Sequence, residues 1–339
     1  MAIETREIGR TGLKVSILGI GGAPLGGNFA ALQPGEARAI VAAGFDAGLT
    51  YADTAPFYGY GRSERAVGDA IRGRDHVLST KVGRLLVPGA APDPARDGMI
   101  DPLPFHPVFD YSYDAIMRSY EDSQQRLGLE RIDILLVHDI GEMQHGARGN
   151  ARHFTDLADG GYRALAELRA AGKVGAIGLG VNETAVCLAA MEIGDWDCFL
   201  LAGRYTLLEQ DPLDDLIPAC SARAITLIVG GPFNSGVLVG RDMWNYAETP
   251  RPVAEKAARL AGICADHGVE LPVAALQFPL AHPVVSAVIP GARSVDEMRG
   301  ILDWAATPTP PALWRDLKAA GLIAARAPLP DGRAILGST

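Results

Sequence analysis

The chain has 339 residues, and 48% of them are hydrophobic, which is enough to form a sizeable core. Its net charge of −9 argues against nucleic acid or an anionic membrane surface as the main partner. No run of about 18 apolar residues occurs, so we expect no membrane span.

The cysteines and the N-terminal segment indicate a cytoplasmic protein. Cys187, Cys198, Cys220 and Cys264 show no CxxC spacing, and we expect all four to be reduced and largely buried. The segment MAIETREIGRTG lacks the apolar stretch of a secretory signal, so none is expected. The sequence makes no prediction of the oligomeric state.

The first predicted element is a small hairpin, residues 4–8 and 14–17 around the turn GRTG, expected at the bottom of a barrel. After it, short apolar stretches alternate with stretches of helical apolar spacing. The eight predicted strands are residues 16–20, 49–53, 76–80, 132–137, 176–180, 198–201, 226–229 and 285–289. The predicted helices are residues 34–47, 63–72, 113–127, 161–171, 183–191, 212–221, 253–280 and 294–304, with Pro272 breaking the stretch 253–280 into two.

This alternation predicts the fold class. Short apolar strands are typical of parallel strands that are buried on both faces. Eight strand–helix repeats predict an α/β protein, a single (β/α)8 TIM barrel over residues 1–339. An open doubly wound sheet is the alternative, although it would usually open with a GxGxxG turn. Three long loops, 84–110, 139–154 and 231–250, follow strands, so we expect them at the C-terminal face, where active sites of this fold lie.

Four ionisable side chains follow three successive predicted strands: Asp53 and Tyr58, then Lys81, then His138. An ionisable group at the end of a buried strand is costly unless it is paired. Singly, each has a commoner structural explanation, such as a turn residue, a solvated lysine or a histidine bonded to backbone. Neighbouring strands lie about 5 Å apart, so the four can share one pocket. Together they predict an acid–base centre, in which Lys81 lowers the pKa of Tyr58 and Asp53 orients Lys81.

The segments DTAPFYGYGRSE, LSTKVG and LLVHD resemble the aldo-keto reductase family, and the resemblance runs from GRTGLKVSILGIGGAPLGG to IPGARSVDEM. It implies an NAD(P)-dependent oxidoreductase on a (β/α)8 barrel, without a metal. The family's catalytic Asp, Tyr, Lys and His match Asp53, Tyr58, Lys81 and His138. The resemblance makes tyrosine the general acid in reduction and the general base in oxidation.

The resemblance also implies a cofactor site, with Asn182 of AIGLGVNE holding the nicotinamide carboxamide. Two positions depart from the family: Ala202 stands where glutamine is frequent, and Gly230–Gly231 stands where a tyrosine often stacks on the nicotinamide. Phe233 and Tyr205 are the candidates to replace that ring. The expected cofactor contacts are Gly22, Asp53, Asn182, Tyr205, Gly230, Gly231, Pro232, Phe233, Ser235, Gly236, Pro290, Gly291, Ala292, Arg293 and Glu297.

The segment IPGARSVDEM opens a predicted helix, whose N-terminus attracts phosphate. Ser294 is the expected N-cap, and Arg293 is expected to pair with a phosphate or stack on adenine. Relatives that prefer NADP carry a basic residue one helical turn on, where this chain has Glu297. We therefore expect NAD+ to be preferred, with NADP+ possible. The alternative is that Glu297 is simply a first-turn acid favoured by the helix dipole.

The segments FHPVFDYSYDAIMRSYEDSQQRLGLERIDILLVHD, IGLGVNE and VGGPFNSGVL resemble a subgroup that includes L-fucose, L-galactose and D-threo-aldose 1-dehydrogenases and pyridoxal 4-dehydrogenase. We expect oxidation of an aldose, such as L-fucose, L-galactose or D-arabinose, at C1 to the lactone, with Tyr58 as the base. Alternatives are a pyridoxal 4-dehydrogenase or general aldehyde and ketone reductase, and a non-enzymatic cofactor-sensing subunit. The expected substrate contacts are Phe57, Tyr58, His138 and Arg148, with His106, Phe109 and His153 as further candidates in the facing loops.

Overall fold

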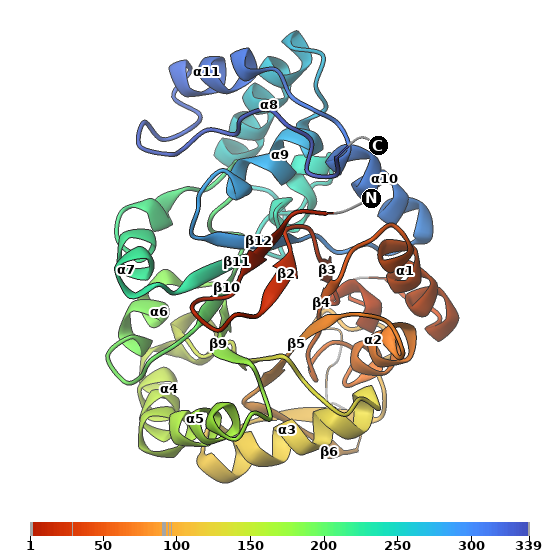
Figure 1. The fold of residues 1–339 in the computed structure, drawn as a ribbon, viewed down its shortest axis with the longest axis vertical. Coiled ribbons are helices and arrows are strands. Elements are labelled where there is room, and N and C mark those ends of the chain that lie inside the picture. The colour runs from red at the N-terminus through yellow and green to blue at the C-terminus, as the bar shows by residue number, and fades with distance from the viewer. Residues whose placement is uncertain (1–2, 29, 90–92, 94, 96, 338–339) are drawn as a thin grey trace.

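The computed structural model describes residues 3–28, 30–89, 93, 95 and 97–337, and eight parallel strands form its centre (Figure 1). In sheet order these strands are β3 (Ile20–Gly21), β4 (Tyr51–Asp53), β5 (Val77–Val82), β8 (Ile134–His138), β9 (Ala176–Val181), β10 (Cys198–Ala202), β11 (Thr226–Gly230) and β12 (Val285–Ile289). The sheet closes because Leu18 bridges Val288 and the N–H of Gly19 donates to the Val288 oxygen at 2.9 Å. This closed ring confirms the predicted (β/α)8 barrel.

Helices surround the strands (Figure 1). They are α1 (Pro34–Asp46), α2 (Arg62–Ile71), α3 (Tyr113–Leu127), α4 (Glu142–Asp156), α5 (Tyr162–Ala170), α6 (Thr184–Ala190), α7 (Leu216–Arg223), α8 (Arg251–Asp266), α9 (Leu271–Leu280), α10 (Val295–Ala305) and α11 (Pro311–Ala319). The stretch 253–280 is two helices, as predicted, but the break falls at residues 267–270. Pro272 lies in the first turn of α9, where a missing N–H costs nothing.

Two helices differ from the sequence-based expectation. The segment 139–154, expected as a loop, is mostly α4. None of its residues is buried, and Gly146 interrupts it with a φ of 63°, so it lacks the apolar periodicity that predicts a helix. Helix α11 was not predicted at all, although Leu313, Trp314 and Leu317 bury one face of it.

The N-terminal hairpin, β1 (Thr5–Glu7) and β2 (Lys14–Ser16), caps the end of the barrel opposite to the loops. The Gly9 N–H donates to Thr226 Oγ1 at 3.0 Å, and Ser286 Oγ donates to the Glu7 oxygen at 2.8 Å. Both partners lie at the start of barrel strands, so the hairpin closes the bottom, as expected. Apolar side chains fill the barrel interior above it: Ile8, Val15, Tyr51, Val77, Ile134, Leu136, Ala176, Cys198, Leu200, Ile228, Ala287 and Ile289.

Two of the three long loops contain local structure of their own. Residues 84–110 include an antiparallel hairpin, β6 (Arg84–Pro88) and β7 (Phe105–Phe109). Residues 231–250 include the short helix η4 (Asn234–Val239) and a turn in which Trp244 bridges Ala247. Residues of the segment 231–250 form part of the wall of the pocket described below.

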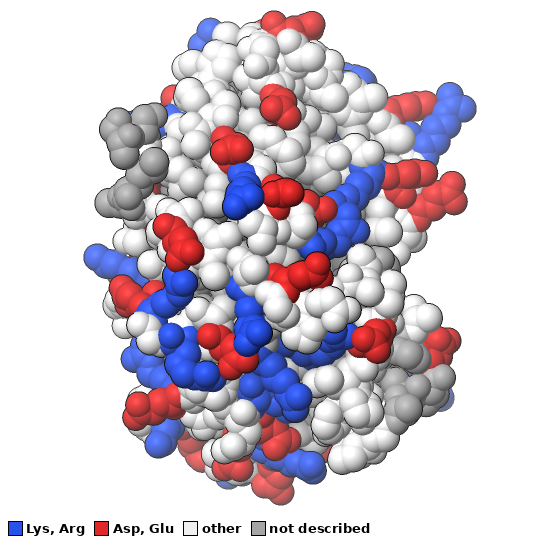
Figure 2. Space-filling model, turned by 90° about the vertical axis from the view of Figure 1, so that its right-hand side faces the viewer, with Lys and Arg blue, Asp and Glu red and all other residues white. Residues whose placement is uncertain are grey.

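Acidic and basic side chains are interspersed over the face shown in Figure 2. Within the described ranges, no helix has both the length and the apolar character needed to cross a membrane. The same part of the chain holds no group of three or more His, Cys, Asp or Glu residues arranged to bind a metal ion. All four cysteines are buried and unpaired.

Candidate active site

A buried ion pair lies at the carboxyl ends of β4 and β5. Lys81 Nζ donates to Asp53 Oδ2 at 2.7 Å and to the Thr54 oxygen at 2.9 Å. Ser79 Oγ donates to Asp53 Oδ1 at 2.6 Å, so both carboxylate oxygens are satisfied. Burial raises the pKa of Asp53, and the Lys81 ammonium acts in the opposite direction.

Glycine at position 180 leaves room for this lysine. A Cβ placed on Gly180 of β9 would lie 3.0 Å from Lys81 Cε and 3.3 Å from its Cδ. A larger residue there would therefore push against the lysine stem across the barrel end. Strand β9, which is separated from β5 by β8, thus leaves space for the lysine.

Tyr58 lies in the turn after β4, above the ion pair. Lys81 Nζ is 4.9 Å from the centre of its ring. Burial raises the pKa of Tyr58 well above its ordinary value, and the carboxylates of Asp53 and Asp139 raise it further. The expectation of a lowered pKa is wrong: the pKa of Tyr58 is raised, and the Lys81 ammonium is paired with Asp53. Tyr58 is therefore a protonated phenol near pH 7.

His138 ends β8 and packs edge-on against Tyr58, with ring centres 5.8 Å apart. Its Nε2 lies 3.6 Å from Asp139 Oδ2, and its buried Nδ1 has no hydrogen-bond partner among the described residues. Burial lowers the pKa of His138 well below its ordinary value, and the charges of Arg84 and Lys81 lower it further. The imidazole is therefore neutral near pH 7, and all four predicted residues lie in one cluster.

Arg84 and Asp139 are also part of this cluster, and the sequence did not reveal them. Arg84 is 2% exposed and forms an ion pair with Asp139. Its guanidinium carbon lies 3.9 Å from the centre of the Phe57 ring and 4.8 Å from that of Phe109. From the sequence, each residue is only the first of a loop that follows a strand. The sequence around each residue gives no indication that the two form an ion pair.

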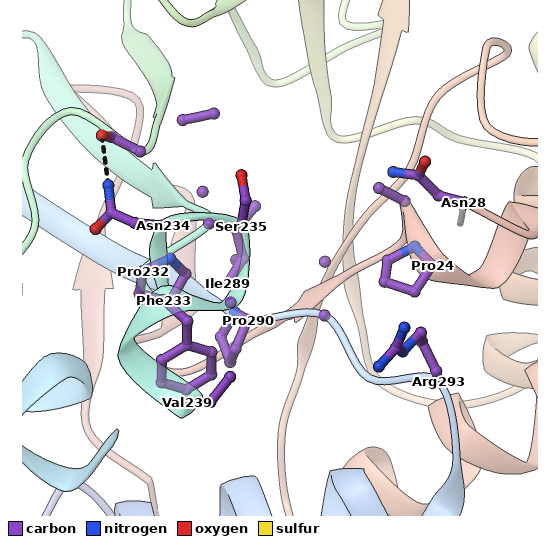
Figure 3. A pocket seen from close by; sticks show the side chains of 18 of the residues that line it. Pro24, Asn28, Pro232, Phe233, Asn234, Ser235, Val239, Ile289, Pro290 and Arg293 are labelled. Carbon is purple, nitrogen blue, oxygen red and sulfur yellow. Dashed lines mark hydrogen bonds between the residues drawn. The ribbon is translucent and has the colours of Figure 1, made fainter. Parts of the chain in front are cut away.

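A pocket of about 740 Å³ extends from Asp53 and Tyr58 to Glu297 and Trp304. Figure 3 shows Pro24, Asn28 and Arg293 on one side of it and residues 232–239 on the other. Among the expected cofactor contacts, those that line it are Asp53, Asn182, Gly230, Gly231, Pro232, Phe233, Ser235, Gly236, Pro290, Gly291, Arg293 and Glu297. Gly22 and Ala292 are next to lining residues in the chain but do not line the pocket themselves.

The N-terminus of α10 forms one end of this pocket. Ser294 Oγ accepts from the Glu297 N–H at 3.0 Å, which confirms the predicted N-cap. The Glu297 carboxylate accepts from the Arg293 N–H at 2.8 Å and pairs with Arg241 at 2.8 Å. Glu297 is therefore both a helix-capping acid and part of the pocket wall, and two arginines flank it.

Comparison with known proteins identifies the family. A model of the aldo/keto reductase family matches residues 17–321. The chain belongs to this family. It is therefore an aldo-keto reductase with oxidoreductase activity, and members of the family generally use NAD(P)H.

Two curated relatives cover nearly the whole aldo-keto reductase chain. A pyridoxal 4-dehydrogenase of Microbacterium luteolum is 44% identical, covering 95% of this chain and 98% of the relative. A D-threo-aldose 1-dehydrogenase of a Pseudomonas species is 37% identical, covering 92% and 96%. The solved aldo-keto reductase of Bacillus halodurans in its holo form shares the fold, with a TM-score of 0.74, 24% identity and coverage of 96% and 98%.

The structure shows what occupies the two positions where this aldo-keto reductase departs from the family pattern. At the first position, the backbone oxygen of Ala202 accepts a hydrogen bond from Asn182 Nδ2 at 3.1 Å. The same Nδ2 lies 3.4 Å from the hydroxyl of Tyr246, which also lines the pocket. The sequence did not single out Tyr246, because it lies in a loop without periodicity. At the second position, Gly231 has a φ of 55° and no side chain, so the pocket is open next to this residue.

Neither proposed substitute for the missing ring stands beside Asn182. Tyr205 is fully buried and packs against Phe278 and His282, outside the pocket. Phe233 lines the pocket but packs edge-on against Trp304, with ring centres 5.8 Å apart. Tyr246 is therefore the aromatic residue that the structure places at the Asn182 end.

Of the remaining candidates for substrate contact, some lie near His138 and others do not. Phe57 lies close to His138, with ring centres 6.1 Å apart. Phe109 and His153 pack with His145, and Phe109 also contacts Arg84, but neither Phe109 nor His153 lines the pocket. His106 lies on β7, and Arg148 is exposed on α4. Neither of these two lines the pocket, so the structure does not bring them to Tyr58.

Proposed function

We propose that this aldo-keto reductase oxidises a cyclic hemiacetal to a lactone by hydride transfer to NAD+, with Tyr58 as the general base. The observation that carries this proposal is the placement of Tyr58, between the Asp53–Lys81 pair and His138, in the wall of a long pocket. In this reaction Tyr58 first gives up its phenol proton to solvent, and its phenolate Oη then takes the proton of the C1 hydroxyl. The C1 hydrogen leaves with its electron pair, and C1 becomes the lactone carbonyl carbon.

The other cluster residues support Tyr58 in this scheme. The Lys81 ammonium, fixed by Asp53 and Thr54, stabilises charge that develops on the phenol oxygen. Neutral His138 is able to hydrogen-bond the reacting oxygen as a donor or as an acceptor. Because the pKa of Tyr58 is raised, the phenol is ready to donate in the reverse, reductive direction.

The pocket suits a dinucleotide. Its volume of about 740 Å³ lies in the range of cofactor sites, and the N-terminus of α10, where the helix dipole favours an anion, forms one end of it. In our proposal Asn182 holds the carboxamide, residues 230–236 cover the middle, and Arg293 meets a phosphate. NAD+, when bound, supplies the hydride acceptor.

We propose NAD+ over NADP+ on the position of Glu297. Its carboxylate lies in the pocket wall at the end marked by Trp304, where it can accept a hydrogen bond from a ribose hydroxyl. The same carboxylate repels a 2′-phosphate. Arg241 is engaged with Glu297 at 2.8 Å, so it is not free to bind that phosphate.

An aldose is the first candidate substrate, in keeping with the 37% identical aldose dehydrogenase. Pyridoxal is the second candidate, and the 44% identical relative favours it. The two share their chemistry, since pyridoxal carries an aldehyde next to a hydroxymethyl group and closes to a cyclic hemiacetal. The hemiacetal hydroxyl of a ring, which is at C1 in an aldose, is thus the common feature that Tyr58 would meet.

A substrate panel tests this proposal. L-fucose, L-galactose, D-arabinose and pyridoxal are each supplied with NAD+ and with NADP+, and absorbance is followed at about 340 nm. We expect an increase with NAD+ for at least one cyclic hemiacetal and isolation of the lactone as product. Absence of turnover with all four compounds would contradict the proposed reaction. A higher kcat/KM with NADP+ than with NAD+ would contradict the cofactor assignment.

A further inference from the structure

The buried ion pair of Arg84 and Asp139 contacts the reaction centre without lining the pocket. Arg84 begins β6, two residues after β5 ends, and its side chain lies between the rings of Phe57 and Phe109. It is 2% exposed and does not line the pocket. A planar guanidinium between two rings is held in one orientation, so its charge is fixed in place.

The Asp139 oxygen that binds Arg84 is also the oxygen nearest to His138. Asp139 Oδ2 is the atom that pairs with the Arg84 guanidinium, and it lies 3.6 Å from His138 Nε2. The Arg84 guanidinium and the His138 imidazole therefore lie beside the same carboxylate oxygen. A free carboxylate at this distance would attract a proton onto the imidazole.

The other groups around His138 do not offer such an attraction. Lys81, on β5, is positively charged and committed to Asp53. From the turn after β4, Tyr58 presents an uncharged ring edge-on. Tyr111 donates its hydroxyl to the His138 backbone oxygen at 2.9 Å, away from the imidazole. Asp139 is thus the one carboxylate, among the described residues, that the structure places beside the ring.

We propose that Arg84 is a positioning residue which, by holding the Asp139 carboxylate, keeps His138 in its neutral form. The lowered pKa of His138 agrees with this arrangement, since burial and then Arg84 are its main causes. A neutral imidazole both donates and accepts hydrogen bonds, whereas the imidazolium only donates. The importance of this for catalysis rests on the function proposed above, but the protonation of His138 does not.

The test is a titration of His138 in the full-length protein without substrate. The protein has seven histidines, and ¹³C-labelled histidine with a His138→Gln variant assigns the signal of His138. In the wild type we expect no titration of His138 between about pH 5 and 8, because burial disfavours the charged ring. In Arg84→Gln, Asp139 becomes free, and we expect a titration midpoint about 1 to 3 pH units higher than in the wild type.

Two further variants separate the carboxylate from the loss of the arginine charge. In Arg84→Gln combined with Asp139→Asn, the rise should be largely abolished, because no carboxylate remains to hold the proton. Arg84→Met makes the same charge change with a side chain that packs well between aromatic rings, and it replaces Arg84→Gln should that variant fail to fold. An unchanged midpoint in the single variants, or an equal rise in the double variant, would overturn the proposal.

A matched control is Arg126→Gln. Arg126 pairs with the fully buried Glu64, so its loss also disrupts a buried ion pair, but away from His138. We expect this variant to lose stability without moving the His138 midpoint. A kinetic readout is the pH profile of kcat/KM for the best substrate of the panel. In Arg84→Gln it should gain an acid limb, falling about tenfold per pH unit below the new midpoint.

Discussion

Lys81 and Asp53 form an ion pair of 2.7 Å, and their side chains are only 1% and 3% exposed. The pair lies at the carboxyl ends of two neighbouring strands, directly below Tyr58. Removing one partner would leave the other charge buried without compensation, which is far more costly than losing the pair altogether.

Asp53→Asn should therefore destabilise the protein strongly. We expect the free energy of unfolding to fall by about 3–5 kcal/mol, because the Lys81 ammonium stays buried. Urea unfolding at neutral pH measures this loss. Ser79→Ala is the control: it removes the hydrogen bonds of Ser79 Oγ to Asp53 and to the Tyr51 hydroxyl, and it should cost about 2 kcal/mol. A loss in Asp53→Asn no larger than in this control would contradict the importance of the pair.

The neutral state of His138 predicts a pH-dependent stability. Its folded pKa is lowered, so between that value and about 6.5 the unfolded chain binds a proton that the native protein does not. The stability is fully present above this window and is lost as the pH falls through it, by about 1.4 kcal/mol per pH unit. Wild type and His138→Gln are compared by urea unfolding from pH 7.5 down to pH 5. Parallel pH profiles would contradict the assignment.

Glu297→Gln tests the origin of cofactor preference. The amide no longer repels a 2′-phosphate and weakens the hold on Arg241 and Arg293. We expect the ratio of kcat/KM for NADP+ to that for NAD+ to rise about tenfold, equivalent to about 1.4 kcal/mol. Asp296→Asn, in the same helical turn, is the control that should leave the ratio nearly unchanged. If both substitutions raised the ratio equally, the loss of a negative charge anywhere in this helical turn would explain the effect, and the specific role of Glu297 would be contradicted.

Tyr246→Phe tests the aromatic residue at the Asn182 end of the pocket. The change keeps the ring but removes the hydroxyl that lies 3.4 Å from Asn182 Nδ2. Losing one such hydrogen bond, worth about 1 kcal/mol, should weaken NAD+ binding about fivefold in a fluorescence titration.

Tyr205→Phe is the matched control for that titration. Its hydroxyl is buried without a hydrogen-bond partner in the described part of the chain, and the ring lies outside the pocket. We therefore expect unchanged NAD+ affinity and no loss of stability. If Tyr205→Phe weakened binding and Tyr246→Phe did not, the roles assigned to the two tyrosines would be reversed.

The barrel and the four-residue cluster could be predicted because both follow from local patterns. Buried parallel strands are short apolar runs, and an ionisable residue at the end of such a run stands out, as Lys81 and His138 do. The α4 helix could not be predicted, since it buries no residue and therefore carries no apolar periodicity. Local sequence carries a signal only where burial imposes a pattern.

Contacts between distant loops could not be read from the sequence. Arg84 and Asp139 are 55 positions apart, and Asn182 and Tyr246 are 64 apart. Nothing near either residue indicates its partner. The pKa of Tyr58 was wrongly expected to be lowered for the same reason: the burial of its hydroxyl and the nearby Asp139 are properties of the folded chain.

The central claim is that Tyr58 transfers the proton in the redox reaction. Its most direct test is kcat/KM of Tyr58→Phe with NAD+ and the best substrate of the panel, with NAD+ affinity measured in parallel. We expect a loss of about 100-fold or more in kcat/KM with NAD+ binding retained, because the acid–base group alone is removed. Undiminished turnover in this variant would contradict the account.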